Sequence, residues 1–257
     1  MHETLSQPSI SRPTWSVREV ESVSSTNDAV ADWAPWTALR AVRQTGGRGR
    51  HQRAWVSDAG GLWLSAVVPM GPPERGWAAL PLAAGLAVCE TLSGLGVRGL
   101  RLRWPNDVMV GPRKLAGLLV DCFRPGSAVV GMGVNVFNHP DREDPLLAGT
   151  TVRLADLVEA PPALPELTAA LLDGVGRVVG VMERDGFGAL GDALDRWWIP
   201  GLRVEVEVEA DGARWAGAFE GVDAEGRLKV RGDDGFLRQY GAHQVTRLRE
   251  TQGIPST

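Results

Sequence analysis

Residues 100–136 read LRLRWPNDVMVGPRKLAGLLVDCFRPGSAVVGMGVNV, and this stretch predicts four successive strands. Apolar and charged side chains alternate over residues 100–104, as is typical of a strand, until a proline interrupts the ladder because it has no N–H to donate. Residues 108–110 and 115–123 flank a Gly-Pro turn, which predicts a strand, a turn and a second strand. Residues 128–136 predict a further strand, with glycines at alternate positions that suit close approach of a ligand or backbone.

The flanking sequence adds both strands and helices. Period-two or continuous apolar runs predict strands over 15–20, 37–42 and 61–69, and helical spacing predicts helices over 29–33, 77–95, 168–184 and 187–198. After an Ile-Pro-Gly boundary at 199–201, short alternating runs separated by glycine turns predict a small β-barrel. We therefore expect an α+β fold with a large domain over 12–199, a barrel over 200–250, and flexible tails at 1–11 and 251–257.

Composition excludes several classes of protein. The 257 residues are 44% hydrophobic and 23% charged, which is ordinary for a globular chain, and the net charge of −4 argues against a general binder of nucleic acid or membrane surfaces. No apolar run approaches the ~20 residues of a membrane span. Cys89 and Cys122 lie in apolar runs without metal-binding spacing, so both are expected to be buried in a protein of the cytoplasm.

Positive charge is concentrated in one segment. Residues 40–53 contain five arginines and no carboxylate, and the second half of the segment, GGRGR, combines flexible backbone with guanidinium groups that can bind a phosphate or carboxylate through paired hydrogen bonds. A solvated loop is the plain alternative, whereas an RNA-binding repeat is disfavoured because the unit occurs once. The common phosphate-loop, Rossmann, zinc-protease and serine-hydrolase motifs are absent from the sequence.

Five motifs in order carry a family resemblance. They are ESVSSTN (21–27), QTGGRGR (44–50) with Trp55, RWPND (103–107), KLAGLL (114–119) and VGMGVN (130–135). Over about residues 15–250 the chain resembles the biotin–protein ligases. The resemblance implies a mixed sheet with helices, like that of class II aminoacyl-tRNA synthetases, followed by an SH3-like barrel. It also implies that biotin and ATP, with Mg²⁺, form biotinyl-5′-AMP, whose biotinyl group passes to a lysine of the biotin carboxyl carrier protein or domain of acetyl-CoA carboxylase or a related carboxylase.

The same resemblance assigns site residues. Lys114, Arg48 and Arg50 are expected to be catalytic, and Asp107 to help hold magnesium. Biotin is expected to contact Ser25, Thr26, Asn27, Gln44, Gly47, Arg48, Lys114 and Gly117. ATP or the adenylate is expected to contact Arg50, Arg53, Trp55, Asn106, Asp107, Gly131, Gly133 and Asn135. From the residues alone, Ser25 or Thr26 could instead cap a helix, Trp55 could be core, and the turn residues could be Lys114, Asn106 and Asp107.

Two departures from the family pattern bear on these expectations. His51-Gln52 stands where the family often has a glycine, which predicts a stiffer loop. Only about fourteen residues precede the first predicted strand, too few for the DNA-binding module of some members, so no nucleic-acid partner is expected. The chain is expected to be a monomer or homodimer. The alternatives are a lipoate or octanoate protein ligase and a non-catalytic biotin sensor.

Overall fold

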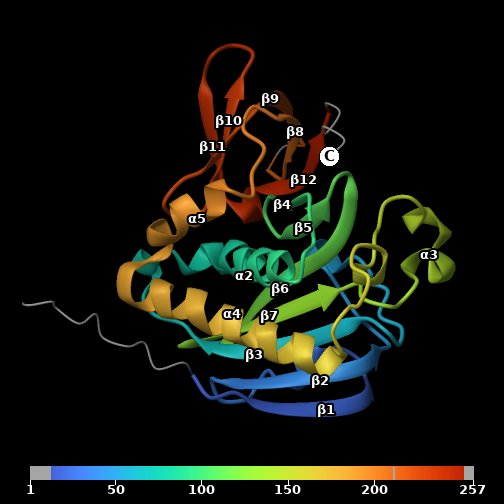
Figure 1. Ribbon diagram of the computed structural model, residues 1–257. Coiled ribbons are helices and arrows are strands. Elements are labelled where there is room, and N and C mark those ends of the chain that lie inside the picture. Colours follow the sequence, from blue (N-terminus) through green and yellow to red (C-terminus); the bar gives the residue numbers. More distant parts are fainter. Residues whose placement is uncertain (1–12, 211, 252–257) are drawn as a thin grey trace, which may run out of the picture.

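The computed structural model describes residues 13–210 and 212–251 and places their strands in two sheets (Figure 1). The larger sheet has seven strands in the order β1-β2-β3-β7-β6-β5-β4 and is mixed, since β1 and β2 run parallel and the other neighbours antiparallel. Its strands are β1 (Ser16–Val23), β2 (Thr37–Gln44), β3 (Leu62–Pro69), β4 (Leu100–Arg103), β5 (Asp107–Val110), β6 (Arg113–Arg124) and β7 (Ser127–Val134). The α+β expectation is confirmed.

Two long helices cover one face of this sheet. They are α2 (Leu80–Gly94) and α4 (Leu164–Asp185), which pack against each other and against the sheet (Figure 1). Because side chains alternate along a strand, Leu64 and Ala66 of β3 join the main core under the helices. Trp63 and Ser65 of the same strand therefore face the opposite side of the sheet.

The opposite face carries the short helix α1 (Thr26–Ala29) and a second, small apolar cluster of Val30, Leu39, Val67 and Val129. Next to that cluster the pocket face carries the small residues Ser65 and Gly131 at its centre. In register, Leu39 lies opposite Ser65, Ser65 opposite Gly131, and Gly131 opposite Leu119. The sheet is thus closed by helices on one side and open to a ligand on the other.

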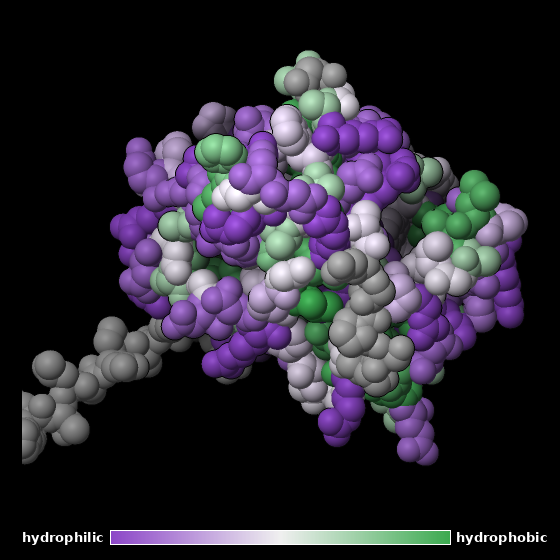
Figure 2. All heavy atoms as spheres, turned by 90° about the horizontal axis from the view of Figure 1, so that it is seen from above, coloured by the Kyte–Doolittle hydropathy of each residue, from purple (hydrophilic) through white to green (hydrophobic). Residues whose placement is uncertain are grey.

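The C-terminal residues form the second sheet, five antiparallel strands in the order β11-β10-β9-β8-β12. They are β8 (Arg203–Val208), β9 (Arg214–Val222), β10 (Leu228–Gly232), β11 (Leu237–Tyr240) and β12 (Val245–Glu250). The expected β-structure is confirmed, while closure into an SH3-like barrel stays a prediction. Figure 2 shows that the face bearing this sheet is largely hydrophilic, with hydrophobic residues in small separate groups.

Buried polar contacts fasten the second sheet to the first. Arg101 of β4 makes a bidentate ion pair with Glu250 of β12, with N–O distances of 2.6 and 2.8 Å, and donates to the Gly111 carbonyl as well. The indole N–H of Trp104 donates to the Gly226 carbonyl at 3.1 Å. These contacts fix β12 at the edge of the pocket.

Several expectations need correction. The helix expected over 29–33 is instead α1, which ends at Ala29, and the Ser25 side chain makes no capping hydrogen bond to it. The helix expected over 187–198 is a 3₁₀ turn (Phe187–Leu190) followed by α5 (Gly191–Asp195), and α3 (Pro140–Glu143) was not predicted. Cys89 is buried as expected, but Cys122 is exposed because it lies near the end of β6.

The expected tails at 1–11 and 252–257 lie outside the described residues. Thr251, which was placed in the C-terminal tail, donates its backbone N–H to the Arg203 carbonyl at 2.9 Å. In the described part of the chain, one segment (Trp77–Gly94) is long and apolar enough to cross a membrane. Two thirds of that segment is buried, because it contains the core helix α2.

Candidate active site

A cavity of about 790 Å³ lies on the open face of the seven-stranded sheet, between the arginine loop and β12. Every residue predicted for the site lines it except Gly47. A side chain at Gly47 would begin 2.4 Å from the Ser57 hydroxyl oxygen and 2.7 Å from the Trp55 carbonyl oxygen, so this residue packs in the wall behind the cavity. The expected residues are therefore brought together, and Gly47 supports them from outside.

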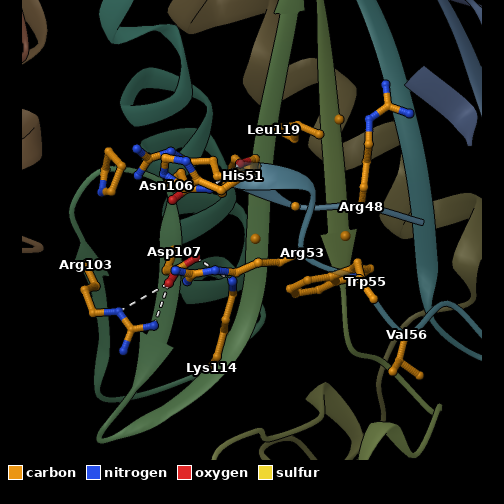
Figure 3. A pocket seen from close by; sticks show the side chains of 18 of the residues that line it. Arg48, His51, Arg53, Trp55, Val56, Arg103, Asn106, Asp107, Lys114 and Leu119 are labelled. Carbon is orange, nitrogen blue, oxygen red and sulfur yellow. Dashed lines mark hydrogen bonds and ion pairs between the residues drawn. The ribbon is translucent and has the colours of Figure 1, made fainter. Parts of the chain in front are cut away.

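A cluster of charges occupies one end of the cavity (Figure 3). One Asp107 carboxylate oxygen lies 2.6 Å from Lys114 Nζ, and the other lies 2.6 Å from Arg103 Nη2. Burial would raise the pKa of Asp107, but the two cations outweigh it and hold the pKa of that carboxyl below its usual value. Arg103 belongs to the RWPND motif but was not predicted as a site residue; its position beside Asp107 depends on β4 pairing with β5.

The Trp55 indole packs against two glycines of the sheet, Gly117 of β6 and Gly133 of β7, which lie opposite each other in register. A Cβ at Gly133 would lie 2.6 Å from Trp55 Nε1, and one at Gly117 would lie 3.1 Å from Trp55 Cζ3. Lys114 Nζ lies 4.6 Å from the indole centroid, within cation–π range. The buried indole N–H has no hydrogen-bond partner among the described residues. The glycines thus accommodate a side chain of the protein itself, and the indole N–H is a free donor.

Hydrogen-bonding groups form the other end of the cavity. Gln44 Oε1 accepts from the backbone N–H of Thr26 at 2.8 Å and lies 2.9 Å from its hydroxyl, while Gln44 Nε2 donates to Ser57 Oγ at 2.9 Å. Asn27 fills the space above Gly131, where a Cβ would lie 2.4 Å from its Oδ1. Ser25, Thr26 and Asn27 are each 4% exposed, so the part of a ligand that contacts them is shielded from water.

The two remaining predicted asparagines brace the cavity wall. Asn106 Nδ2 donates to the Leu118 carbonyl at 2.6 Å, and Asn135 Oδ1 accepts from Asn138 at 3.1 Å. Asn135 is 2% exposed. Both residues line the cavity, yet their amides are engaged with the protein.

Two arginines of the loop, Arg48 and Arg50, have different partners. Arg48 forms an ion pair with Asp28 and lies 3.5 Å from the Asp121 carboxylate, and Figure 3 shows it pointing away from Lys114. Hydrogen bonding to Arg48 lowers the pKa of Asp28. Arg50 Nη2 donates to the carbonyls of Ala242 and Val245, at 2.6 and 3.1 Å.

Two other arginines of the basic segment pair with the neighbouring strand of the sheet. Arg40 and Arg43 of β2 form ion pairs with Glu19 and Glu21 of the neighbouring β1, and neither lines the cavity. These two arginines of the basic segment are therefore paired with carboxylates outside the cavity. Their partners come from the adjacent parallel strand, which the linear sequence does not reveal.

His51 and Gln52 adopt the left-handed backbone conformation, with φ of 54° and 56°. A glycine would adopt this conformation freely, whereas each non-glycine residue costs about 1 kcal/mol there. The stiffer loop stays a prediction, and its physical reason is that side chains restrict the backbone at both positions.

Two groups of lining residues were not predicted. One is strand β12, residues 245–250, and the other is Pro140, Leu147, Thr150 and Thr151 from the segment after β7. Strand β12 lies far from the motifs in sequence, whereas the second group follows the last motif closely, and neither carries a distinctive residue pattern. Within the described ranges there is no cluster of three or more histidine, cysteine, aspartate or glutamate side chains that could hold a metal ion.

Comparison with known proteins agrees with this geometry. Residues 19–136 match the biotin/lipoate A/B protein ligase family. The chain is 32% identical over 225 residues to the biotin–[acetyl-CoA-carboxylase] ligase of Mycobacterium tuberculosis, covering 82% of each chain. It is 30% identical to the ligase of the same name from Paracoccus denitrificans, covering 82% of this chain and 92% of that one.

A solved structure shares the fold. The biotin protein ligase of Aquifex aeolicus in complex with biotin and ATP superposes with a TM-score of 0.79 at 24% identity, over 92% of this chain and 99% of that one.

Proposed function

Since the chain belongs to the biotin/lipoate A/B protein ligase family, we propose that it is a biotin–protein ligase, which uses ATP to attach biotin to a lysine of a carrier protein. One observation carries the proposal. A single cavity has a buried hydrogen-bonding end at Thr26 and Gln44 and a cationic end at Lys114 and Arg103. Biotin has a polar ureido ring and a carboxylate, and ATP brings a polyphosphate to that carboxylate.

We place the ureido ring at the buried polar end. Ser25 and Thr26, which are buried, and Gln44, which is partly buried, offer hydroxyl and amide groups with which a neutral polar ring exchanges hydration for hydrogen bonds. Asn27 and Gly131 shape the wall there, and Gly47 allows the loop backbone to approach. This orientation directs the biotin carboxylate along the sheet toward Gly117 and Lys114.

In the first step a biotin carboxylate oxygen attacks the α-phosphorus of ATP and the bond from that phosphorus to the bridging oxygen breaks. Biotinyl-5′-AMP forms and pyrophosphate leaves with the bonding electrons. Lys114 contributes a cation at the reacting oxygens, where charge is redistributed as the phosphoryl group transfers. An entering triphosphate competes with Asp107 for Lys114, whose Nζ lies 2.6 Å from that carboxylate.

The adenine ring is proposed to stack on Trp55, whose free indole N–H lies in the same cavity. Arg50 and Arg53 then close over the adenylate from the side of β12, with Asn106, Asp107, Gly133 and Asn135 in the surrounding wall. Arg48, with Arg50, is proposed to balance the charge of the mixed anhydride after exchanging part of its pairing with Asp28 for the ligand.

In the second step the uncharged amine of the acceptor lysine attacks the carbonyl carbon of the anhydride. An amide bond forms, AMP leaves, and the amine loses its proton. Because the cavity holds the anhydride of the adenylate in place, the acceptor protein needs to present only its lysine side chain. The proposed acceptor is the carrier domain of a biotin-dependent carboxylase, as the relatives' names indicate.

The described residues do not fit a protein-held magnesium ion. Asp107 was expected as its ligand, but both oxygens of that carboxylate already contact cations, and Mg²⁺ prefers carboxylate, phosphate and water oxygens in octahedral geometry. We propose that Mg²⁺ enters as part of the Mg·ATP substrate. A cytoplasmic location, the absence of nucleic-acid partners and a monomeric or homodimeric state stay predictions.

The test is pyrophosphate release by the purified chain with Mg·ATP and either biotin or lipoate, followed by mass spectrometry of a biotin carrier domain. Biotin-dependent release and a single biotinylated lysine are expected. Turnover with lipoate alone would make the protein a lipoate ligase, and biotin binding without adenylate in a single-turnover assay would make it a sensor.

A further inference from the structure

Ser65 is a fully buried hydroxyl in the middle of β3, with 0% of the residue exposed. It stands in the apolar run LWLSAVVP and faces the pocket side of the sheet, opposite Gly131 in register. A buried hydroxyl lowers stability unless it is hydrogen-bonded. Ser65 is not among the residues that line the cavity, so its effect on a ligand must pass through its neighbours.

Two of those neighbours belong to the proposed biotin site. Ser65 Oγ lies 2.7 Å from Thr26 Oγ1 and 2.6 Å from Asn27 Oδ1, and Thr26 Oγ1 lies 2.9 Å from Gln44 Oε1. These are three oxygen–oxygen contacts with only two hydroxyl protons to fill them. One contact must therefore lack a proton.

The surroundings decide which one. Asn27 Nδ2 lies 2.8 Å from the Asp121 carboxylate and 3.4 Å from the Leu119 carbonyl, two acceptors, so the oxygen of its amide must face Ser65. Ser65 therefore donates to Asn27. Thr26 then has one hydroxyl proton for two contacts, the 2.7 Å contact to Ser65 Oγ and the 2.9 Å contact to Gln44 Oε1.

Gln44 is compatible with this assignment. Ser57 Oγ donates to the Trp55 carbonyl at 2.9 Å and accepts from Gln44 Nε2, which keeps Gln44 Oε1 toward Thr26. That oxygen already accepts from the backbone N–H of Thr26. With the Thr26 proton in the shorter of its two contacts, the one to Ser65, two acceptor oxygens, Thr26 Oγ1 and Gln44 Oε1, lie side by side in the cavity.

We propose that Ser65 is a positioning residue that turns the Thr26 hydroxyl into an acceptor, so that the cavity selects a ligand with an N–H donor at this point. The inference rests on the proposed function and makes it specific. A ureido N–H that reaches the paired oxygens supplies the missing proton. An analogue with an ether oxygen there brings a third acceptor to the pair and is rejected.

The test is the ratio of kcat/KM for biotin to kcat/KM for cyclic carbamates in which oxygen replaces each ureido N–H in turn, measured by pyrophosphate release. A site built to bind an N–H rejects an analogue that lacks it, so we expect the protein to disfavour one carbamate by at least about 100-fold. Ser65→Ala frees the Thr26 proton to rotate toward Gln44 or the ligand, and the ratio should fall to about tenfold or less.

Two controls separate positioning from a general structural role. Ser127→Ala removes another buried serine, at the far end of β7, and should leave the ratio unchanged. Ser65→Thr keeps the hydroxyl and should retain the ratio. Ser65→Cys replaces the hydroxyl by a thiol of similar size, which is a weak donor and a weak acceptor, so the ratio should fall. This variant keeps the test available if Ser65→Ala does not fold.

A Ser65→Ala or Ser65→Cys variant that lowers activity with biotin and carbamate equally, leaving the ratio intact, overturns the inference. The proposed function is judged separately, on the unmodified chain. If that chain releases no pyrophosphate with biotin, the proposed function fails, and the inference fails with it.

Discussion

Replacing Arg101 by methionine should destabilise the protein strongly, because it breaks a buried bidentate ion pair. The Arg101 and Glu250 side chains are 6% and 10% exposed, and their N–O distances are 2.6 and 2.8 Å. Arg101 also supplies two hydrogen bonds to the Gly111 carbonyl, at 3.1 and 3.0 Å. Arg101→Met leaves the Glu250 carboxylate and the Gly111 carbonyl buried without these donors.

Removing one partner of a buried ion pair costs about 3–5 kcal/mol, since a charge remains without compensation. With a urea dependence of about 3 kcal/mol/M, the transition that reports on the second sheet should move down by about 1–1.7 M. Intrinsic tryptophan fluorescence and far-UV circular dichroism during urea titration measure the shift. The double variant Arg101→Met/Glu250→Leu should recover most of the loss, because no charge is left buried.

An exposed pair of the same geometry provides the control. Arg203 and Asp233 also form a bidentate pair, but their side chains are 36% and 67% exposed, so Arg203→Met should leave the urea midpoint where it is. The reasoning is refuted if Arg101→Met and Arg203→Met shift the midpoint equally, or if the double variant is less stable than Arg101→Met. Because β12 lines the cavity, Arg101→Met should also raise the KM for ATP more than that for biotin.

Three further predictions concern the cavity itself. Lys114→Ala should lower the rate of adenylate formation by about 10²–10³ while weakening biotin binding less, as separated by single-turnover kinetics and calorimetry, because the cation acts on charge that develops in the transition state; equal losses would contradict that role. Arg50→Gly removes charged hydrogen bonds, worth about 1.5–3 kcal/mol, that hold the arginine loop against Ala242 and Val245. The loop over biotinyl-AMP should then open more readily, so release of the adenylate should rise at least about tenfold and bystander lysines should be labelled, which unchanged acceptor selectivity in mass spectrometry would disprove. Gly133→Ala places a Cβ 2.6 Å from Trp55 Nε1 and should raise the KM for ATP with little effect on biotin affinity, whereas Gly94→Ala, with no neighbour within 4 Å of the added Cβ, should change neither.

The main elements could be predicted because their signals are local. Alternation in residues 100–104, the continuous apolar run of β3 and the glycine turns after Arg203 each identify strands from a few adjacent residues. The motifs likewise named residues that the fold gathers around one cavity. Sequence alone failed where tertiary partners decide: Cys122 looked buried by its neighbours, and the ends of the two misplaced helices are set by packing.

By itself, the sequence determined the α+β architecture, the family resemblance and most of the residues around the cavity, because hydrophobic period and motif order are properties of the linear chain. Only the tertiary structure decided what each side chain does there. It turned Arg40 and Arg43 toward glutamates on β1, brought β12 to the cavity from the C-terminal end of the chain, and gave Asp107 two cations. It also placed Ser65 behind Thr26, because hydrogen-bond partners and charge neutralisation depend on distances of a few ångströms between strands that are distant in sequence.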